Sequence, residues 1–397
     1  MKAKRQSITG WIIFICAFFA IVIFSLLYFF IPSLSVLEYH VDIVSASTTP
    51  IQKPWVVTHI KIPEPVKGIY MTSWVAGSKA LREGVVALVD SSEVNSIVID
   101  IKDYSGRISF KTDNPILASA VENRIPDIRD FIESLHKKNI YVIGRIAVFQ
   151  DPYMVKLHPE MAVKKGSNHA EVWKDYKGIS WIDAGAEEYW QYIVELGKAA
   201  YAEGFDELNF DYIRFPSDGN MRDIYYPYSH GVVKPDVIEN FFKYIHEGLD
   251  GRGIKMSADL FGMTATNSDD LNIGQVLERA LPYFDAIAPM IYSSHYPTGF
   301  MGYKNPASMP YEVVKFSMDK AVERSSTTPG KIRPWLQDFN LGAIYTEAMV
   351  RAQKKAAYDA GATSWMMWNA ASKYTKAAFD VDPEKALNQK SATTSSQ

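Results

Sequence analysis

The sequence predicts an α/β fold, a parallel (β/α)8 TIM barrel preceded by one transmembrane helix, and three observations lead to this fold class. Apolar, strand-like segments recur eight times within about 310 residues. Segments with apolar residues at helical spacing lie between them. The first strand-like segment is not followed by the Gly-x-Gly-x-x-Gly motif of a doubly wound sheet, because residues 74–78 read WVAGS. A closed barrel is therefore favoured over an open sheet.

The N-terminal end predicts a membrane anchor. Lys2, Lys4 and Arg5 precede a largely apolar run, and residues 8–31 are long enough to cross roughly 30 Å of hydrocarbon as a helix. Basic residues on the short side predict that residues 1–7 are cytoplasmic and that the rest of the chain is extracytoplasmic, held at the cell membrane by a single pass. Cleavage and secretion is the alternative, but no small-x-small site follows the run closely.

The next segment, residues 32–65, predicts a linker or stalk, because it is rich in Ser and Thr around residues 45–50 and carries prolines at 54, 63 and 65. We expect the folded domain over residues 66–386 and a disordered polar tail over residues 387–397. Cys16 is the only cysteine and lies in the apolar run, which excludes a disulfide framework and a thiolate zinc site in the domain.

Strands and helices are expected to alternate along the domain. The predicted strands are 66–74, 96–103, 140–150, 205–215, 255–262, 284–292, 333–339 and 363–369. The predicted helices are 126–138, 186–203, 237–250, 273–280, 311–324 and 346–360. A last helix-like piece follows Ala370 and ends near Ala386.

The segment FDELNFDYIRFP at residues 205–216 is the strand around which the rest is organised. Its alternating apolar residues predict a buried strand, yet Asp211 lies near its end. Burying an unpaired carboxylate costs several kcal/mol. Asp211 is therefore either half of a structural ion pair, with Arg214 or a neighbouring strand, or a functional carboxylate.

Polar and aromatic side chains collect at the predicted carboxyl ends of the strands, which in a (β/α)8 barrel is where chemistry takes place. In chain order they are Trp74, Asp100, Lys102, Arg145, Gln150, Asp151, Asp211, Arg214, Asp259, Tyr292, His295, Gln337, Asp338, Trp368 and Asn369. Carboxylates and flat rings around one cavity suit cleavage of a glycosidic bond, because one carboxyl protonates the leaving oxygen and a second attacks the sugar or activates water. Arg145 would keep Asp211 ionised.

Structural roles remain open for several of these residues. Asp100 and Lys102 are equally well explained as an ion pair of the barrel, and Arg145 as a partner of Asp211 or Asp100. His295 is either a proton shuttle or a hydrogen-bonding wall residue. Trp74 and Trp368 are at least as well explained by the core as by sugar stacking.

Other classes of function fit the sequence less well. A net charge of −3 gives no basic field for a nucleic acid. A metal-dependent hydrolase of this fold would need histidines on several strands, and the predicted strands two, four, five, seven and eight have none. Asp100, Asp103 and Asp151 offer only scattered oxygens, so we assign no metal and no cofactor.

Several long runs in the same order resemble the bacterial putative glycosyl hydrolase domain family, whose barrels are distantly similar to the α-amylase superfamily. They include VIDIKDYSGRISF, YVIGRIAVFQDP, FDELNFDYIRFP, SADLFG, RPWLQDF and SWMMWNA. The resemblance implies that Asp211 is the nucleophile, Asp259 the general acid/base and Asp338 a residue that binds sugar hydroxyls. Two positions depart from the amylase pattern: Asn209 stands where an arginine is usual, and Asp259 where a glutamate is usual.

The sequence thus leads us to expect a membrane-anchored glycoside hydrolase that acts on a polysaccharide or glycoconjugate of the cell envelope or the extracellular space. Two alternatives remain. A non-catalytic glycan-binding barrel would keep the aromatic cleft but need no pair of carboxyls at working distance. A structural partner of an envelope complex would instead expose an apolar patch away from the barrel mouth.

Overall fold

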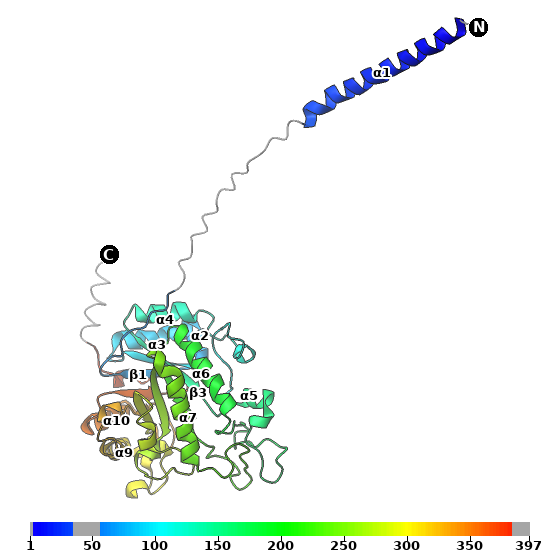
Figure 1. Cartoon of the computed structure of the whole chain (residues 1–397). Helices are drawn as coiled ribbons and strands as arrows, with labels where there is room; N and C mark the ends of the chain where they lie inside the picture. Colours follow the sequence, from blue (N-terminus) through cyan, green and yellow to red (C-terminus); the bar gives the residue numbers. More distant parts are fainter. Residues whose placement is uncertain (1–2, 35–55, 383–397) are drawn as a thin grey trace, which may run out of the picture. The chain divides into compact units, whose positions relative to one another are not determined.

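The computed structural model describes residues 3–34 and 56–382 and divides the chain into two compact units, Met1–Val56 and Val57–Gln397 (Figure 1). The first unit contains helix α1, Ala3–Leu34. Within the described residues, no helix is both long and apolar enough to cross a membrane, so the predicted transmembrane segment 8–31 is not supported by the structure. Most of the predicted linker and the predicted tail 387–397 lie outside the described residues.

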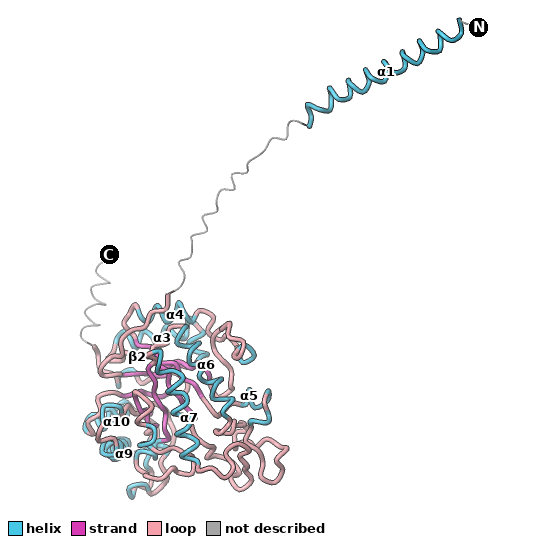
Figure 2. The backbone as a smooth tube through the Cα atoms, viewed as in Figure 1, coloured by secondary structure: helices cyan, strands magenta, loops and turns pink. Residues whose placement is uncertain are grey.

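Eight parallel strands form a closed barrel, as predicted. Each strand pairs with the next, and β1 pairs with β8 to close the ring, with Lys67 opposite Trp365. The strands are β1 Lys67–Met71, β2 Ser96–Lys102, β3 Tyr141–Ala147, β4 Glu207–Asp211, β5 Lys255–Phe261, β6 Ala286–Met290, β7 Trp335–Gln337 and β8 Trp365–Trp368. All eight predicted strands are confirmed, although each is shorter than expected. Figure 2 shows the strands at the centre of the domain with helices around them.

The helices follow the predicted alternation. They are α2 Ser73–Gly77, α3 Lys79–Ser91, α4 Ile128–His136, α5 Pro152–Leu157, α6 Glu187–Ala202, α7 Lys234–Leu249, α8 Leu277–Ala280, α9 Pro310–Arg324 and α10 Glu347–Asp359. All six predicted helices are present. Helix α3 was not predicted, although its buried residues Val85, Leu88 and Val89 have helical spacing. The helix expected after Ala370 is wrong for the described residues, where only a 3-10 turn, Lys376–Ala378, forms.

Two apolar cores stabilise the barrel. The larger core lies between the strands and the surrounding helices, and the smaller one fills the barrel with side chains such as Tyr141, Ile143, Trp335 and Met366. The smaller core is interrupted by a buried ion pair between Glu207 and Arg333, whose side chains are 1% and 2% exposed. The barrel interior therefore combines apolar packing with a column of polar groups.

The segment before β1 closes the barrel at the end where the strands begin. Ile60 and Ile62 pack against the interior core, and the Ile60 N–H donates to Asp206 Oδ1 at 2.9 Å. The ring of His59 stacks on Tyr201 with centroids 3.8 Å apart. Residues from Val57 onward accordingly belong to the same compact unit as the barrel.

Asp206 offers a test of this closure. Its carboxylate accepts from Ile60 N, from Val142 N at 2.8 Å and from His136 at 2.9 Å. Replacing it with alanine leaves two buried N–H groups without an acceptor, so we expect Asp206→Ala to lower the free energy of unfolding by about 2–4 kcal/mol at pH 7. Urea unfolding measures this change.

The loss should depend on pH. Burial raises the pKa of Asp206, but the hydrogen bonds from His136 and Val142, together with the His59 ring 3.7 Å away, outweigh it and hold that pKa below its usual value. The contribution of a carboxyl with a lowered pKa is present above its unfolded pKa and disappears as the pH falls through the folded one, so the difference between wild type and variant should shrink below about pH 4. Asp130→Ala, at an exposed position of α4, is the matched control and should cost less than about 1 kcal/mol. Equal losses in the two variants would contradict the proposed role of Asp206.

Candidate active site

A single arginine gathers three carboxylates near the carboxyl ends of neighbouring strands. Arg145 on β3 donates to Asp100 Oδ1 on β2 at 2.7 Å and, through Nε, to Asp211 Oδ2 on β4 at 3.1 Å. Its Nη2 contacts the same oxygen of Asp211, and its Nε lies 3.9 Å from Asp259 Oδ2 on β5. Strand register contributes to this, because Asp100 is opposite Arg145 and Ala147 is opposite Asp211. Residues from four strands thus meet at one guanidinium.

Asp259 is the most enclosed of the three carboxylates, with 1% of the residue exposed. Its Oδ1 accepts two hydrogen bonds, from Asn209 Nδ2 at 2.8 Å and from Trp335 Nε1 at 2.7 Å. Burial, and after it the negative charge of Asp211, raise the pKa of Asp259 well above its usual value. Because Oδ1 is occupied by two donors, the proton of the neutral acid belongs on Oδ2, the oxygen nearer Arg145.

Asp211 ends β4, and its carboxylate is held from two sides. Tyr212, which follows it, has a φ of 52° and donates its backbone N–H to Asp211 Oδ1 at 2.6 Å, while Oδ2 is bound by Arg145. The Asp211 side chain remains 7% exposed. Since Arg145 Nε lies 3.1 Å from Asp211 Oδ2 and 3.9 Å from Asp259 Oδ2, these oxygens are at most about 7 Å apart, so they are not too far apart for a carboxyl pair of a glycosidase.

Asp100 is bound to aromatic residues on its other side. The hydroxyl of Tyr70 donates to Asp100 Oδ2, and the Tyr70 ring stacks on Trp368 with centroids 3.9 Å apart. The guanidinium of Arg145 lies 5.0 Å from the Trp368 ring. Trp368 is half-buried, so one part of this stack reaches solvent at the barrel mouth.

Lys102 and Asp151 are not part of this cluster. They form a buried ion pair of 2.8 Å with both side chains 0% exposed, and Tyr189 of α6 donates to Asp151 at 2.7 Å. A register shift between Asp100 and Lys102 turns Lys102 out of the barrel. A sealed pair between strand and helix fits a structural role, and the substrate contact of these two residues stays a prediction.

Asp338 is likewise separated from the paired carboxylates. Both of its oxygens accept from Thr375, from the backbone N–H and from the hydroxyl, each at 2.8 Å. Burial raises the pKa of Asp338 despite these bonds. The residue fixes the segment after β8, and its role in binding sugar hydroxyls stays a prediction.

The remaining predicted residues differ in burial and in their contacts. Gln337 is fully buried and engaged with Ser294 and Phe339, and Asn369 bonds backbone groups of its neighbours. Tyr292 and the exposed His295 pack edge-on, with ring centroids 5.2 Å apart.

Trp74 is 61% exposed and lies under Arg124 at 4.4 Å, so it is a surface residue rather than a core residue. Gln150 donates to Asp175 at 3.4 Å, and Arg214 is half-buried beside Trp181.

Tyr70, Asn209 and Trp335 contribute to the site and were not predicted to do so. Asn209 was noted only as a departure from a family pattern. Alternation along a strand could have found the others, because Trp335 shares an inward face with Gln337 at the next position but one. No sequence signal indicates that the Trp335 indole would meet Asp259.

Metal binding has no preformed site in the part of the chain that the structure describes, where no group of three His, Cys, Asp or Glu residues could hold an ion. The three aspartates that the sequence offers as possible metal ligands already have cationic partners. Asp103 pairs with Arg124, Asp151 with Lys102 and Asp100 with Arg145.

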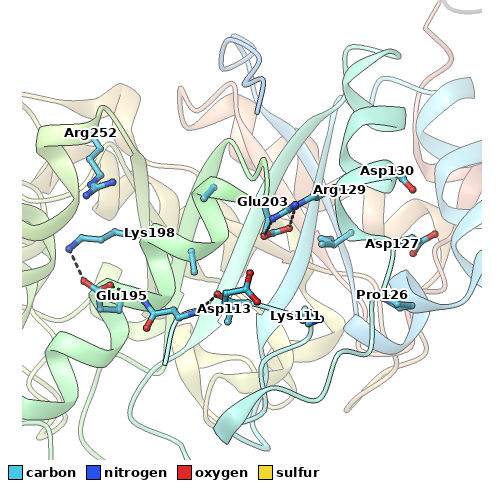
Figure 3. Close-up of a pocket in the computed structure, with 15 residues that line it drawn as sticks. Lys111, Asp113, Pro126, Asp127, Arg129, Asp130, Glu195, Lys198, Glu203 and Arg252 are labelled. Carbon is cyan, nitrogen blue, oxygen red and sulfur yellow. Dashed lines mark hydrogen bonds and ion pairs between the residues drawn. The ribbon is translucent and has the colours of Figure 1, made fainter. Parts of the chain in front are cut away.

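A cavity of about 740 Å³ lies elsewhere, between the loop after β2 and helices α4 and α6 (Figure 3). Its charged side chains are largely paired with one another, Arg129 with Glu203 at 2.6 Å and Lys198 with Glu195 at 2.8 Å. None of the residues bound to Arg145 lines it. We therefore place the candidate active site at the carboxylate cluster rather than in this cavity.

Comparison with known families places most of the domain in one family. A family model described as "Putative glycosyl hydrolase domain" matches residues 68–374. The chain belongs to this family. Every residue that contacts Arg145 lies within the matched range. No curated protein sequence matches the chain.

Solved structures of similar fold include three glycoside hydrolases. The glycoside hydrolase domain of PgaB (BpsB) from Bordetella bronchiseptica is 12% identical, covers 78% of this chain and 95% of its own, and has a TM-score of 0.56. α-L-Fucosidase isoenzyme 2 from Paenibacillus thiaminolyticus is 13% identical over 83% of this chain and 50% of its own, with a TM-score of 0.53. The β-amylase catalytic domain from Paenibacillus polymyxa is 8% identical over 83% and 98%, with a TM-score of 0.51. At such identities these structures show the shared barrel fold alone.

The raised pKa of Asp259 can be tested by removing its charged neighbour. In Asp211→Asn the repulsion disappears while Arg145 remains, so the pKa of Asp259 should fall towards its usual range without reaching it, because burial is unchanged. The measurement is the pH titration of the Asp259 carboxyl carbon by NMR in protein with 13C-labelled aspartate. Asp338→Asn, which removes a carboxylate that does not contact Arg145, should leave this titration unchanged. A fall of equal size in both variants would mean that Asp211 is not the source.

Proposed function

We propose that the protein is a glycoside hydrolase in which Asp211 and Asp259 are the reacting carboxyl groups. The observation that carries the proposal is that both contact the same guanidinium, within 4 Å of Arg145 Nε, but in different surroundings. Asp211 is paired with Arg145, whereas burial and the charge of Asp211 raise the pKa of Asp259 well above its usual value and so favour its protonated form. When two nearby carboxyls have environments that differ in this way, one can act as the acid and the other as the nucleophile or base.

In the proposed reaction Asp259 donates its proton from Oδ2 to the leaving glycosidic oxygen. Asp211 attacks the anomeric carbon or activates a water molecule that does so. Asn209 and Trp335 hold Oδ1 of Asp259 and leave Oδ2 available for this transfer. Trp368, half-buried on its stack with Tyr70, is the ring best placed to support the sugar.

The substrate must meet Asp211 first, because the side chain of Asp211 is 7% exposed and that of Asp259 only 1%. Proton transfer from Asp259 therefore requires the mouth to open locally when the glycan binds. Catalytic hydrogen bonds that tighten only in the substrate complex are common, so the closed geometry is compatible with the role.

A non-catalytic glycan-binding barrel is the second candidate. It is favoured by the fact that Asp100 and Asp211 both form ion pairs with Arg145, as structural carboxylates would. It differs from the hydrolase in one respect: the charge of Asp211 would contribute to stability and not to turnover.

Turnover by single variants decides between the two. We expect the fragment that begins at Val57 to release reducing ends from at least one polysaccharide of a panel of envelope and extracellular glycans. Asp211→Asn and Asp259→Asn should each reduce the rate by about 10²–10⁴-fold. Asp259→Asn should remain folded, because the asparagine oxygen can still accept from Asn209 and Trp335.

Asp130→Asn, an exposed change on α4, is the control and should keep full activity. If both active-site variants fold and bind glycan, and neither they nor the wild type releases sugar, the binding-protein candidate is correct.

The location of the domain outside the cytoplasm is proposed from the sequence alone. The basic residues Lys2, Lys4 and Arg5 before the apolar run support it, and an envelope or extracellular polysaccharide would then be the accessible substrate. Protease added to intact cells with a permeable outer layer should digest the domain as readily as in lysed cells. Protection in intact cells would place the domain in the cytoplasm.

A further inference from the structure

Arg214, in the loop after β4, lacks an anionic partner. Its Nη1 donates to the carbonyl of Phe215 and to Ser217 Oγ, each at 3.0 Å. No carboxylate of the described residues lies within the 4.0 Å of an ion pair from it, whereas the buried guanidinium groups of Arg145 and Arg333 each have one. Burial lowers the pKa of Arg214 in spite of carboxylates farther away. A half-buried cation without a counter-ion is costly, so its retention needs a reason.

Two aromatic rings hold this guanidinium in place. It lies 5.1 Å from the ring of Trp181 and 5.6 Å from that of Tyr212, and these two rings are themselves in edge contact at 5.7 Å. Trp181 is buried and fixed by a hydrogen bond from its Nε1 to Asp175. Such contacts orient the planar group and favour the cation without neutralising it.

The carboxylates in the neighbourhood are engaged elsewhere or exposed. Asp175 Oδ1 accepts from Lys177 N and Ile179 N, each at 2.9 Å, and its Oδ2 accepts from Trp181. Asp211 is bound to Arg145, and Asp218 is exposed to solvent. The positive charge of Arg214 is thus left available to a ligand.

Arg214 also lies close to the proposed reaction. Tyr212, on which it stacks, gives its backbone N–H to Asp211, and Arg214 follows two residues later on the same loop. A group bound by Arg214 would therefore belong to a sugar at or next to the one that Asp211 attacks.

We propose that Arg214, held between Trp181 and Tyr212, is a subsite for a negatively charged substituent of the glycan, a carboxylate or a phosphate, so that the substrate is an acidic polysaccharide. The guanidinium fork matches either group, and the neighbouring rings suit the apolar face of the sugar that carries it. The inference rests on the proposed function for the role of the bound glycan, but the subsite itself can be tested by binding alone.

The test is calorimetric titration of the full chain with D-glucuronate, D-glucose 6-phosphate and D-glucose. At least one charged sugar should bind about tenfold or more tightly than glucose, and its affinity should fall as salt is added. Arg214→Met should abolish this preference, Arg214→Lys should keep part of it, and Arg222→Met, an exposed arginine of the same loop, should keep all of it. Preference for only one charged sugar would identify the substituent.

Equal binding of all three sugars, or a preference that survives in a folded Arg214→Met variant, would overturn the proposal. If that variant does not fold, the salt dependence in the wild type and the Arg214→Lys variant still decide. The result is separable from turnover: charged sugars that bind through Arg214 to a protein without hydrolytic activity would retain the subsite and refute the enzyme.

Discussion

The site depends on the ion cluster around Arg145. One guanidinium, 5% exposed, binds carboxylates from the strands on both sides of β3 and approaches a third on β5. Taking these charges out of water is expensive, and only dense mutual pairing offsets the cost. Removing Arg145 or one of its carboxylates would leave a buried charge uncompensated. Because these residues must stay together, the cluster fixes the relative positions of four strands at their carboxyl ends. Stability alone does not require it, since apolar residues of similar volume commonly serve a barrel core as well.

A column of polar groups connects this cluster to the opposite end of the barrel. Arg333 pairs with Glu207, Ser257 donates to Glu207 at 2.6 Å, and Asn209 donates both to Ser257 at 3.0 Å and to Asp259 at 2.8 Å. Glu207 thereby receives a full positive charge, whereas Asp259 receives only neutral donors and a distant share of Arg145. Burial and the charge of Asp211 outweigh these neutral donors, so the pKa of Asp259 stays well above its usual value.

Some residues of the fold and the candidate site could be predicted from the sequence, and others could not. Eight strands and the gathering of Asp211, Asp259 and Arg145 follow from alternation and from the rule that parallel strands end together. The direction of the Lys102 side chain was predicted wrongly, because a shift of register after Asp100 reverses it. No local feature of the sequence indicates such a shift. The bonds between Asp338 and Thr375 could not be predicted, because Thr375 lies 37 residues further along the chain. Trp335 was overlooked because a tryptophan in a strand is normally assigned to the apolar core. Its role becomes visible only when Asp259 is known to accept from its indole N–H.

Arg145 and Arg214 show how burial and pairing together distinguish structure from recognition. Both guanidinium groups lie beside aromatic rings near Asp211, yet one is saturated by carboxylates and the other has only a carbonyl and a hydroxyl. The saturated group can bind nothing more, so it fixes the reacting carboxyls. The unsaturated group gains from any anion that replaces the water it has lost, and it is half-buried rather than sealed. An acidic glycan would therefore enter with its charge on Arg214 and its reacting carbon towards Asp211, and the enclosed Asp259 would be reached last. The charge of the glycan would then be recognised before the barrel mouth opens and makes Asp259 accessible.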